Sequence, residues 1–232
     1  MDASKTPRPG QWADVLCPQG IGERLHGFAA EIFPICRSIT GPGVRETMDH
    51  IERIVPLART EVASGTQVLD WTVPDEWTIR DAWVKNAAGA RVIDFKAHSL
   101  HVLNYATPMH ARMPLADLKK RIFTLPDQPD LIPYRTSYYS KQWGFCASHN
   151  VVQALPDGEY EACIDADLAP GSLTYAEHVH PGATTDEVLV QAHICHPSLA
   201  NDNCSGISVL AHLAAAMQGL RTKYTYRFLF AP

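Results

Sequence analysis

Hydrophobic residues recur at the spacing of one helix face in two stretches near the N-terminus. In residues 21–36 the apolar positions lie three or four residues apart, which predicts an amphipathic helix whose last turn is disturbed by Pro34. Residues 44–55 repeat this spacing and predict a second helix, directly after the Gly-Pro-Gly loop at 41–43. Both helices therefore have one face that must pack against another element.

The pattern changes near residue 61, where β-branched, aromatic and turn-forming residues become frequent. Short apolar runs predict strands at residues 68–73, 82–85, 91–95, 143–146 and 160–165. Turn sequences at 86–89 and 156–158 predict hairpin connections, and residues 115–121 predict one short helix. We interpret residues 63–181 as a β-rich inserted domain.

After residue 181 the chain reads as strand, helix and strand. Residues 187–192 and 224–230 are apolar almost throughout, whereas 205–218 has helical spacing. Strands without polar alternation are typical of a parallel sheet that is covered on both faces. The predicted fold class is therefore α/β, with a mostly parallel sheet and helices on both faces.

The expected domain organisation follows from these patterns. Residues 21–62 and 182–232 form the α/β core, residues 63–181 form the inserted domain, and residues 1–20 are a flexible tail. A doubly wound domain rarely stops directly after its second parallel strand, so we expect a truncated core rather than an unusually small sheet.

Composition narrows the class of protein. The net charge is −5 and 19% of the residues are charged, which argues against a nucleic-acid partner. Apolar runs are too short for a membrane span, and the N-terminus has no secretory signal, so we expect a cytoplasmic protein. The six cysteines form no CxxC pair and indicate no disulfide framework.

The candidate chemistry lies between the strand at 187–192 and the helix at 205–218. His193 follows the strand, His196 lies in the turn, and Asp202 precedes the helix. Ligands of α/β sheets gather at the carboxyl ends of strands. Imidazole and carboxylate groups together suit a divalent transition metal, zinc first.

Each of these residues also has a purely structural interpretation. Asp202 could cap the following helix instead of bridging two cations, and His193 could be a hydrogen-bonded core residue instead of a ligand. His196 could bind metal, contact substrate or hydrogen-bond a loop carbonyl. Cys195 is expected to support the site rather than to coordinate, and no base is identifiable that would make it a nucleophile.

The segment from His193 to Gly206 resembles the first metal-binding segment of the co-catalytic di-zinc aminopeptidases. It contains the motifs His-x-Cys-His and Asn-Asp-Asn-x-Ser-Gly, and it lies between a predicted strand and a predicted helix. From about residue 21 onward the chain more closely resembles bacterial aminopeptidase-like proteins associated with polysaccharide biosynthesis. The stretches that carry this resemblance are 33–41, 70–74, 133–139, 170–175 and 195–203.

The resemblance implies a zinc-dependent exopeptidase fold in which His193 binds one zinc ion and Asp202 bridges two. It also implies a cis peptide bond between Asp202 and Asn203. Two departures concern the donors, because Cys195 replaces the aspartate that steadies the imidazole, and His196 is an additional potential ligand.

The third departure concerns catalysis. In the aminopeptidases the general-base glutamate and the remaining ligands follow the next strand, which would place them beyond Pro232. No catalytic residue is therefore assigned, and we expect this chain alone to bind zinc poorly and to hydrolyse nothing.

The leading functional interpretation is a metal-dependent hydrolase of the aminopeptidase type, acting on a small peptide or amide substrate. An amidase or deacetylase acting on an amino-sugar glycan precursor is one alternative. A non-catalytic binding or scaffold module is another, and Cys195 in place of a carboxylate favours it mildly. None of these interpretations fixes the oligomeric state.

Overall fold

The computed structural model describes residues 11–232, which separate into two compact units. Unit 1 contains residues 11–63 and 173–232, and unit 2 contains residues 64–172. The expected tail at 1–20 lies partly outside the described residues. Its second half contains a short helix, α1 (Trp12–Leu16), and Leu16 packs against the core of unit 1.

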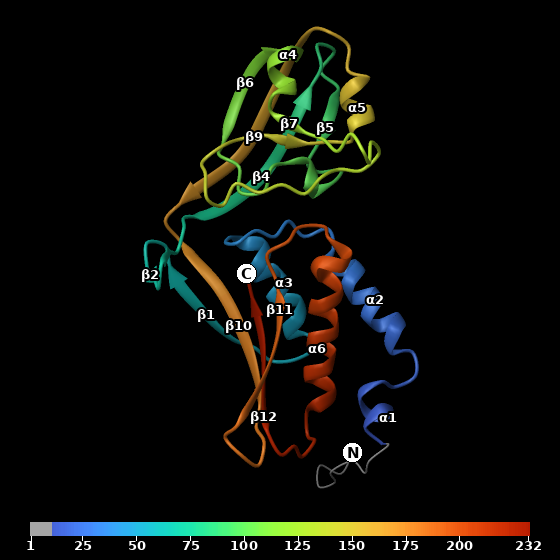
Figure 1. The fold of residues 1–232 in the computed structure, drawn as a ribbon, viewed down its shortest axis with the longest axis vertical. Coiled ribbons are helices and arrows are strands. Elements are labelled where there is room, and N and C mark those ends of the chain that lie inside the picture. The colour runs from blue at the N-terminus through green and yellow to red at the C-terminus, as the bar shows by residue number, and fades with distance from the viewer. Residues whose placement is uncertain (1–10) are drawn as a thin grey trace. The chain divides into compact units, whose positions relative to one another are not determined.

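Unit 1 has a four-stranded sheet in the order β1-β10-β12-β11, with helices packed on it (Figure 1). The strands are β1 (Ala58–Ala63), β10 (Ser172–His180), β11 (Glu187–His193) and β12 (Thr225–Ala231). The longer helices are α2 (Ile21–Ile32), α3 (Pro42–Glu52) and α6 (Ser205–Met217). The predicted helices and the predicted strand–helix–strand segment are thus all present.

Pairing in this sheet is mixed. β11 and β12 are parallel, whereas β10 pairs with β12 in the antiparallel direction. The predicted α/β class is confirmed, and the two strands that α6 connects pair in parallel. The sequence pattern places residues 172–180 in the β-rich insertion, but Ala176 of β10 is fully buried in the core of unit 1. Unit 2 therefore ends at Ser172 and not at residue 181.

The buried positions of the sheet of unit 1 alternate and share one face. Ala176, Ala192, Phe228 and Phe230 pack in one cluster with side chains from α2, α3 and α6. Residues on the opposite face, such as Leu189, remain exposed. The described helices therefore cover one face of this sheet, where the sequence indicated helices on both.

Unit 2 is built around a second four-stranded sheet in the order β5-β4-β9-β6. These strands are β4 (Glu76–Lys85), β5 (Arg91–Asp94), β6 (Met109–Pro114) and β9 (Glu159–Ala169). Shorter elements complete the unit: β2 (Gln67–Val68), β3 (Trp71–Thr72), η1 (Ser99–His101), α4 (Leu115–Lys119), β7 (Ile122–Phe123), β8 (Phe145–Cys146) and α5 (His149–Gln153).

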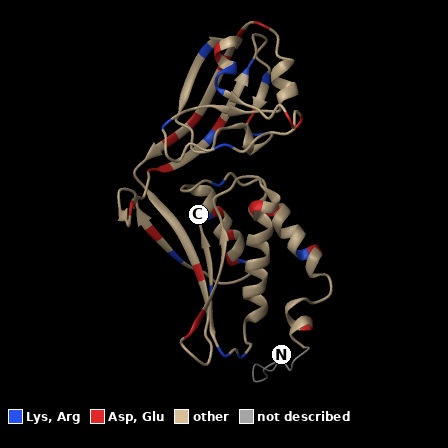
Figure 2. Ribbon diagram, in the orientation of Figure 1, with Lys and Arg blue, Asp and Glu red and all other residues tan. Residues whose placement is uncertain are grey.

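One predicted hairpin of unit 2 is confirmed and another is wrong. The turn at 86–89 joins β4 to β5, and Asn86 Oδ1 accepts hydrogen bonds from the backbone N–H groups of Ala88 and Ala90. The turn at 156–158 instead follows α5, where Ser148 Oγ accepts from Val151 N–H and caps the helix. β4 carries both basic and acidic residues, whereas the charged residues of β9 are all acidic (Figure 2).

None of the helices in the described residues has both the length and the apolar character needed to cross a membrane.

Candidate functional site

His193 is the last residue of β11 and pairs in register with Ala231 of β12. Alternation along β11 buries Ala192 on the helix-covered side and leaves the His193 side chain exposed. The buried Ile194 then continues the strand by donating its N–H to the carbonyl oxygen of Ala231, at 3.0 Å. The imidazole of His193 thus stands at the carboxyl end of a parallel pair, as the sequence predicted.

Asp202 lies in a five-residue turn, η2 (Ala200–Cys204), that leads into α6. Its backbone angles (φ −125°, ψ 85°) are not helical, and the Asp202–Asn203 peptide bond is cis. The cis bond that the resemblance implied is therefore confirmed.

The side chain of Asn203 joins the end of β11 to the first turn of α6. Its Nδ2 donates to the carbonyl oxygen of His193 at 3.4 Å, and its Oδ1 accepts from the N–H of Gly206 at 3.1 Å. Asn203, and not Asp202, thus satisfies an otherwise unpaired donor at the start of α6. This arrangement leaves the Asp202 carboxylate, which is 65% exposed, facing His196.

His196 lies in the turn between His193 and Asp202. Its Nδ1 is 3.2 Å from Asp202 Oδ1 and also 3.2 Å from the Asp202 carbonyl oxygen. The rings of His193 and His196 are 6.0 Å apart between centroids. Of the three roles left open by the sequence, contact with a loop carbonyl is the one that this geometry displays.

Two cysteines beside these residues are buried. Burial raises the pKa of the Cys195 thiol to about 11, and it also raises the pKa of Cys204. At neutral pH both groups are therefore uncharged thiols. A neutral thiol at Cys195 does not supply the negative charge with which a carboxylate steadies an imidazole.

Arg37 is a residue that the sequence analysis did not single out. It follows α2, is fully buried, and donates hydrogen bonds to the loop that carries His196. Burial lowers the pKa of the Arg37 guanidinium below its ordinary value. A charged residue directly after the apolar run at 32–36 was the available signal, because a guanidinium in such a position needs several internal acceptors.

These donors fit zinc in kind but not in number. Imidazole nitrogen and carboxylate oxygen are ordinary zinc ligands, and closed sites use four of them. Among residues 11–232, however, no three His, Cys, Asp or Glu side chains come close enough together to hold one ion. The assignment of His193, Asp202 and His196 as metal ligands thus stays a prediction, and the described residues do not form a complete zinc site.

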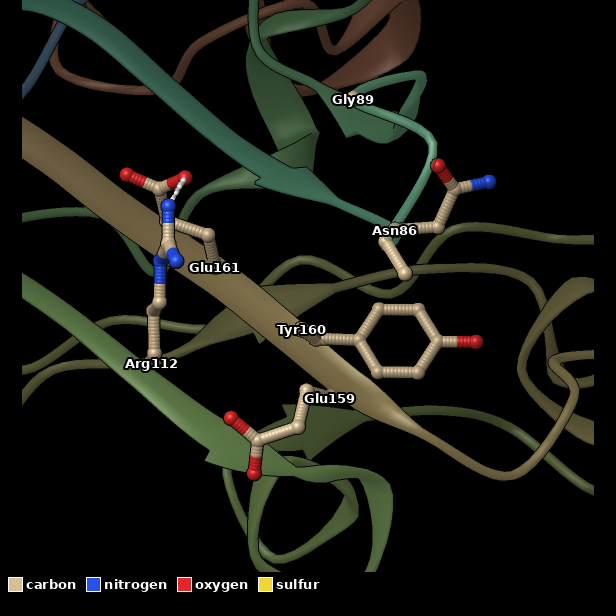
Figure 3. A pocket seen from close by; sticks show the side chains of 7 residues that line it. Asn86, Gly89, Arg112, Glu159, Tyr160 and Glu161 are labelled. Carbon is tan, nitrogen blue, oxygen red and sulfur yellow. Dashed lines mark hydrogen bonds and ion pairs between the residues drawn. The ribbon is translucent and has the colours of Figure 1, made fainter.

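Unit 2 contains a hollow of about 260 Å³ (Figure 3). Arg112 on β6 and Glu161 on β9 line it and form an ion pair, 3.5 Å apart. Glu161 also contacts His110 Nε2 at 2.6 Å, and the Tyr160 hydroxyl donates to the carbonyl oxygen of Pro156. Because Arg112 and Glu161 already pair with one another, this hollow is a weaker candidate site than the His193–Asp202 segment.

Comparison with known proteins gives close matches over most of the chain. Residues 26–232 match the family model described as "Domain of unknown function (DUF4910)". A Clostridium acetobutylicum protein, named as a candidate polysaccharide biosynthesis protein with an aminopeptidase-like domain, is 50% identical over 211 residues. These residues cover 91% of this chain and 49% of that protein, so the chain spans about half the length of its relative.

Solved structures agree with these matches. The crystal structure of a candidate peptidase from C. acetobutylicum has a TM-score of 0.92 and 48% identity, and the match covers 97% of this chain and 52% of that chain. The zinc aminopeptidase BSAP from Bacillus subtilis gives a TM-score of 0.58 at 14% identity, covering 91% and 60% of the two chains.

A peptidase M28 precursor from Shewanella amazonensis gives a TM-score of 0.59 at 10% identity, covering 95% and 65%. The likeness of this protein and of BSAP to the chain shows the fold alone. That fold is aminopeptidase-like, and the resemblance inferred from sequence is confirmed.

Proposed function

Because the chain belongs to the DUF4910 family and has an aminopeptidase-like fold, we propose that it carries part of the metal centre of a hydrolase. The hydrolase is of the aminopeptidase type and cleaves peptide or amide bonds. The homologues support a peptidase-type hydrolase in general. The metal, the ligands and the substrate are the finer parts of this proposal.

One observation carries the proposal. An imidazole at the carboxyl end of β11 and a carboxylate just before α6 are joined by a turn in which His196 contacts that carboxylate at 3.2 Å. A strand end followed by a helix start is where α/β folds gather their ligands. Neither His193 nor Asp202 is needed for packing, because both side chains are exposed.

The proposed roles follow from these positions. His193 would hold zinc through a ring nitrogen, Asp202 would hold it through its carboxylate as the bridging residue, and His196 would orient Asp202 or add a third donor. Zinc, when bound, supplies Lewis-acid polarisation of a substrate carbonyl. With at most three donors against the usual four, we propose that this chain alone binds zinc weakly and hydrolyses no peptide.

Metal titration of the purified 232-residue protein tests the ligand assignment. We expect weak zinc binding by calorimetry, and its loss in His193→Ala and Asp202→Asn. His26→Ala is the matched control because His26 is an exposed histidine on α2. Zinc binding that is undetectable in the unaltered protein, or equal in all four proteins, contradicts the assignment.

The activity is tested on the longer relative. We expect the full-length C. acetobutylicum protein to release the amine from an aminoacyl anilide in the presence of zinc. Substitution of the residue that aligns with His193 should abolish this release. A full-length protein that binds zinc but cleaves neither peptides nor amides would indicate a scaffold.

The name of the same relative favours a second candidate substrate. Because that protein is associated with polysaccharide biosynthesis, an N-acylated amino sugar is the alternative amide. Parallel assays with aminoacyl anilides and N-acetylated amino sugars distinguish a peptidase from a deacetylase, since both reactions can use the same metal donors.

A further inference from the structure

The guanidinium of Arg37 connects three segments of unit 1 (residues 11–63 with 173–232). Its Nη1 donates to the carbonyl oxygen of Ile32 at the end of α2, at 2.7 Å, and to Thr47 Oγ1 on α3, at 3.3 Å. Its Nε donates to the carbonyl oxygen of His196 at 2.9 Å, and its Nη2 donates to Cys204 Sγ at 3.2 Å. The side chain is 0% exposed.

A buried guanidinium is costly unless its donors are satisfied, so its geometry is informative. Arginine presents five N–H donors in a fixed plane, and lysine presents one compact ammonium. Here all three guanidinium nitrogens have acceptors, and those acceptors lie on α2, on α3 and on the segment 196–204. One planar group thus fixes how the segments are spaced.

Two of these contacts bracket the turn that carries Asp202. His196 precedes the turn η2 by four residues and Cys204 is its last residue, and Arg37 holds one atom of each. Within the turn, the N–H of Cys204 donates to the carbonyl oxygen of Leu199 at 3.2 Å, and His196 contacts Asp202. The arginine therefore sets the distance between the two ends of a short segment whose middle contains the exposed carboxylate.

We propose that Arg37 is a positioning residue for the segment 196–204. It holds the ends of this segment against α2 and α3, and it thereby keeps His196 against Asp202 before any ligand arrives. The consequence for metal binding rests on the proposed function. The positioning itself does not, because it concerns the conformation of this chain alone.

Arg37→Met and Arg37→Lys test the proposal. Methionine removes every donor at similar length, and lysine keeps the charge but replaces the planar guanidinium with one compact ammonium. Thr47→Val is the matched control, because it removes the contact with α3 and leaves the two loop contacts in place.

The measurement is amide hydrogen exchange at Cys204, followed by NMR or mass spectrometry. We expect exchange at Cys204 to accelerate at least about tenfold in both Arg37 variants, measured relative to the slowest amides of α6 and β12. Those amides report global unfolding, so a merely structural arginine would accelerate all sites in proportion. Thr47→Val should leave the ratio unchanged.

Zinc titration provides the second readout. We expect the affinity to fall by about 10- to 100-fold in Arg37→Met, the usual effect of losing a group that orients metal ligands. An unchanged exchange ratio at Cys204 overturns the positioning role, whatever zinc does. An altered exchange ratio in a protein that binds no zinc upholds the positioning role and rejects the metal assignment, so the two hypotheses fail separately.

Discussion

The Nδ1 atom of His196 lies at the same distance, 3.2 Å, from the side-chain Oδ1 and the main-chain oxygen of Asp202. One ring nitrogen therefore contacts one carboxylate oxygen and the main-chain oxygen of the residue proposed to bridge metal ions. Because the two residues are only six positions apart, this contact also closes the turn between β11 and α6. The relationship gives His196 a role in orienting Asp202 that does not require it to bind metal.

Substitution of His196 separates orientation from ligation. We expect His196→Ala to lower zinc affinity by about tenfold, less than the loss from His193→Ala, because an orienting group is removed and not a ligand. His196→Asn should restore most of the affinity, since the asparagine amide can donate from nearly the position of Nδ1. Calorimetric titration provides the affinities. A loss in His196→Asn as complete as in His193→Ala would instead identify a ligand.

Gly43 on α3 is a position where no side chain fits. A Cβ atom there would lie 2.1 Å from the carbonyl oxygen of Cys36, which is backbone and cannot rotate away. We expect Gly43→Ala to destabilise the fold by about 2 kcal/mol or more, the range of overpacked cores.

The matched control is Gly27→Ala on α2, where a Cβ would meet no atom within 4 Å. We expect this change to stabilise the protein by about 0.5–1 kcal/mol through helix propensity. Urea denaturation measures both values, and equal effects at the two glycines would refute the steric argument.

His180 on β10 makes stability depend on pH. It is 6% exposed and its Nε2 has no hydrogen-bond partner among the described residues, and burial lowers its pKa below the ordinary 6.5. Below about pH 6.5 the unfolded chain therefore binds a proton that the folded chain does not. We expect the free energy of unfolding to fall as the pH is lowered from 7 towards 5.

The variant His180→Asn should remove this dependence, which denaturation at several pH values would show. Carboxylate groups affect the stability over a lower range of pH. Hydrogen bonds from Arg53 and Arg91 lower the pKa values of Glu31 and Asp81, so their contributions are lost only as the pH falls below about 4.5. If the free energy of unfolding still falls between pH 7 and 5 in His180→Asn, this pH dependence does not arise from His180.

Phe230 on β12 is fully buried in the cluster beneath α6. We expect Phe230→Ala to lower the free energy of unfolding by about 3–5 kcal/mol, because the substitution removes apolar contacts and also leaves a cavity. Arg53→Ala removes an exposed ion pair with Glu31 and should cost less than about 1 kcal/mol. Denaturant midpoints compare the two, and similar costs would show that Phe230 does not anchor this core.

The segment 187–230 was predictable because its signals are local. Two apolar runs and one helical run stand in sequence, and the structure places β11, α6 and β12 on them within one or two residues. The chemistry of His193 and Asp202 was visible for the same reason, since strand end, turn and helix start adjoin along the chain.

Contacts between distant residues were not predictable. β1 was missed because Arg59 and Glu61 interrupt its pattern, and these charges are accommodated by partners elsewhere, such as Glu52 and Thr174. Arg37 was missed because its acceptors include residues 196 and 204, far along the chain. Sequence periodicity shows which face of an element is buried, but not which remote groups satisfy a charge placed there.

The position of β11 at the end of its sheet has a consequence for handling the protein. Within residues 11–232 its outer side meets no further strand, and Val188 and Leu189 are 36% and 56% exposed. The unpaired main-chain N–H and C=O groups of an edge strand can pair with a strand from another molecule. Light scattering should therefore show self-association that grows with concentration, and a lysine introduced by Leu189→Lys should reduce it.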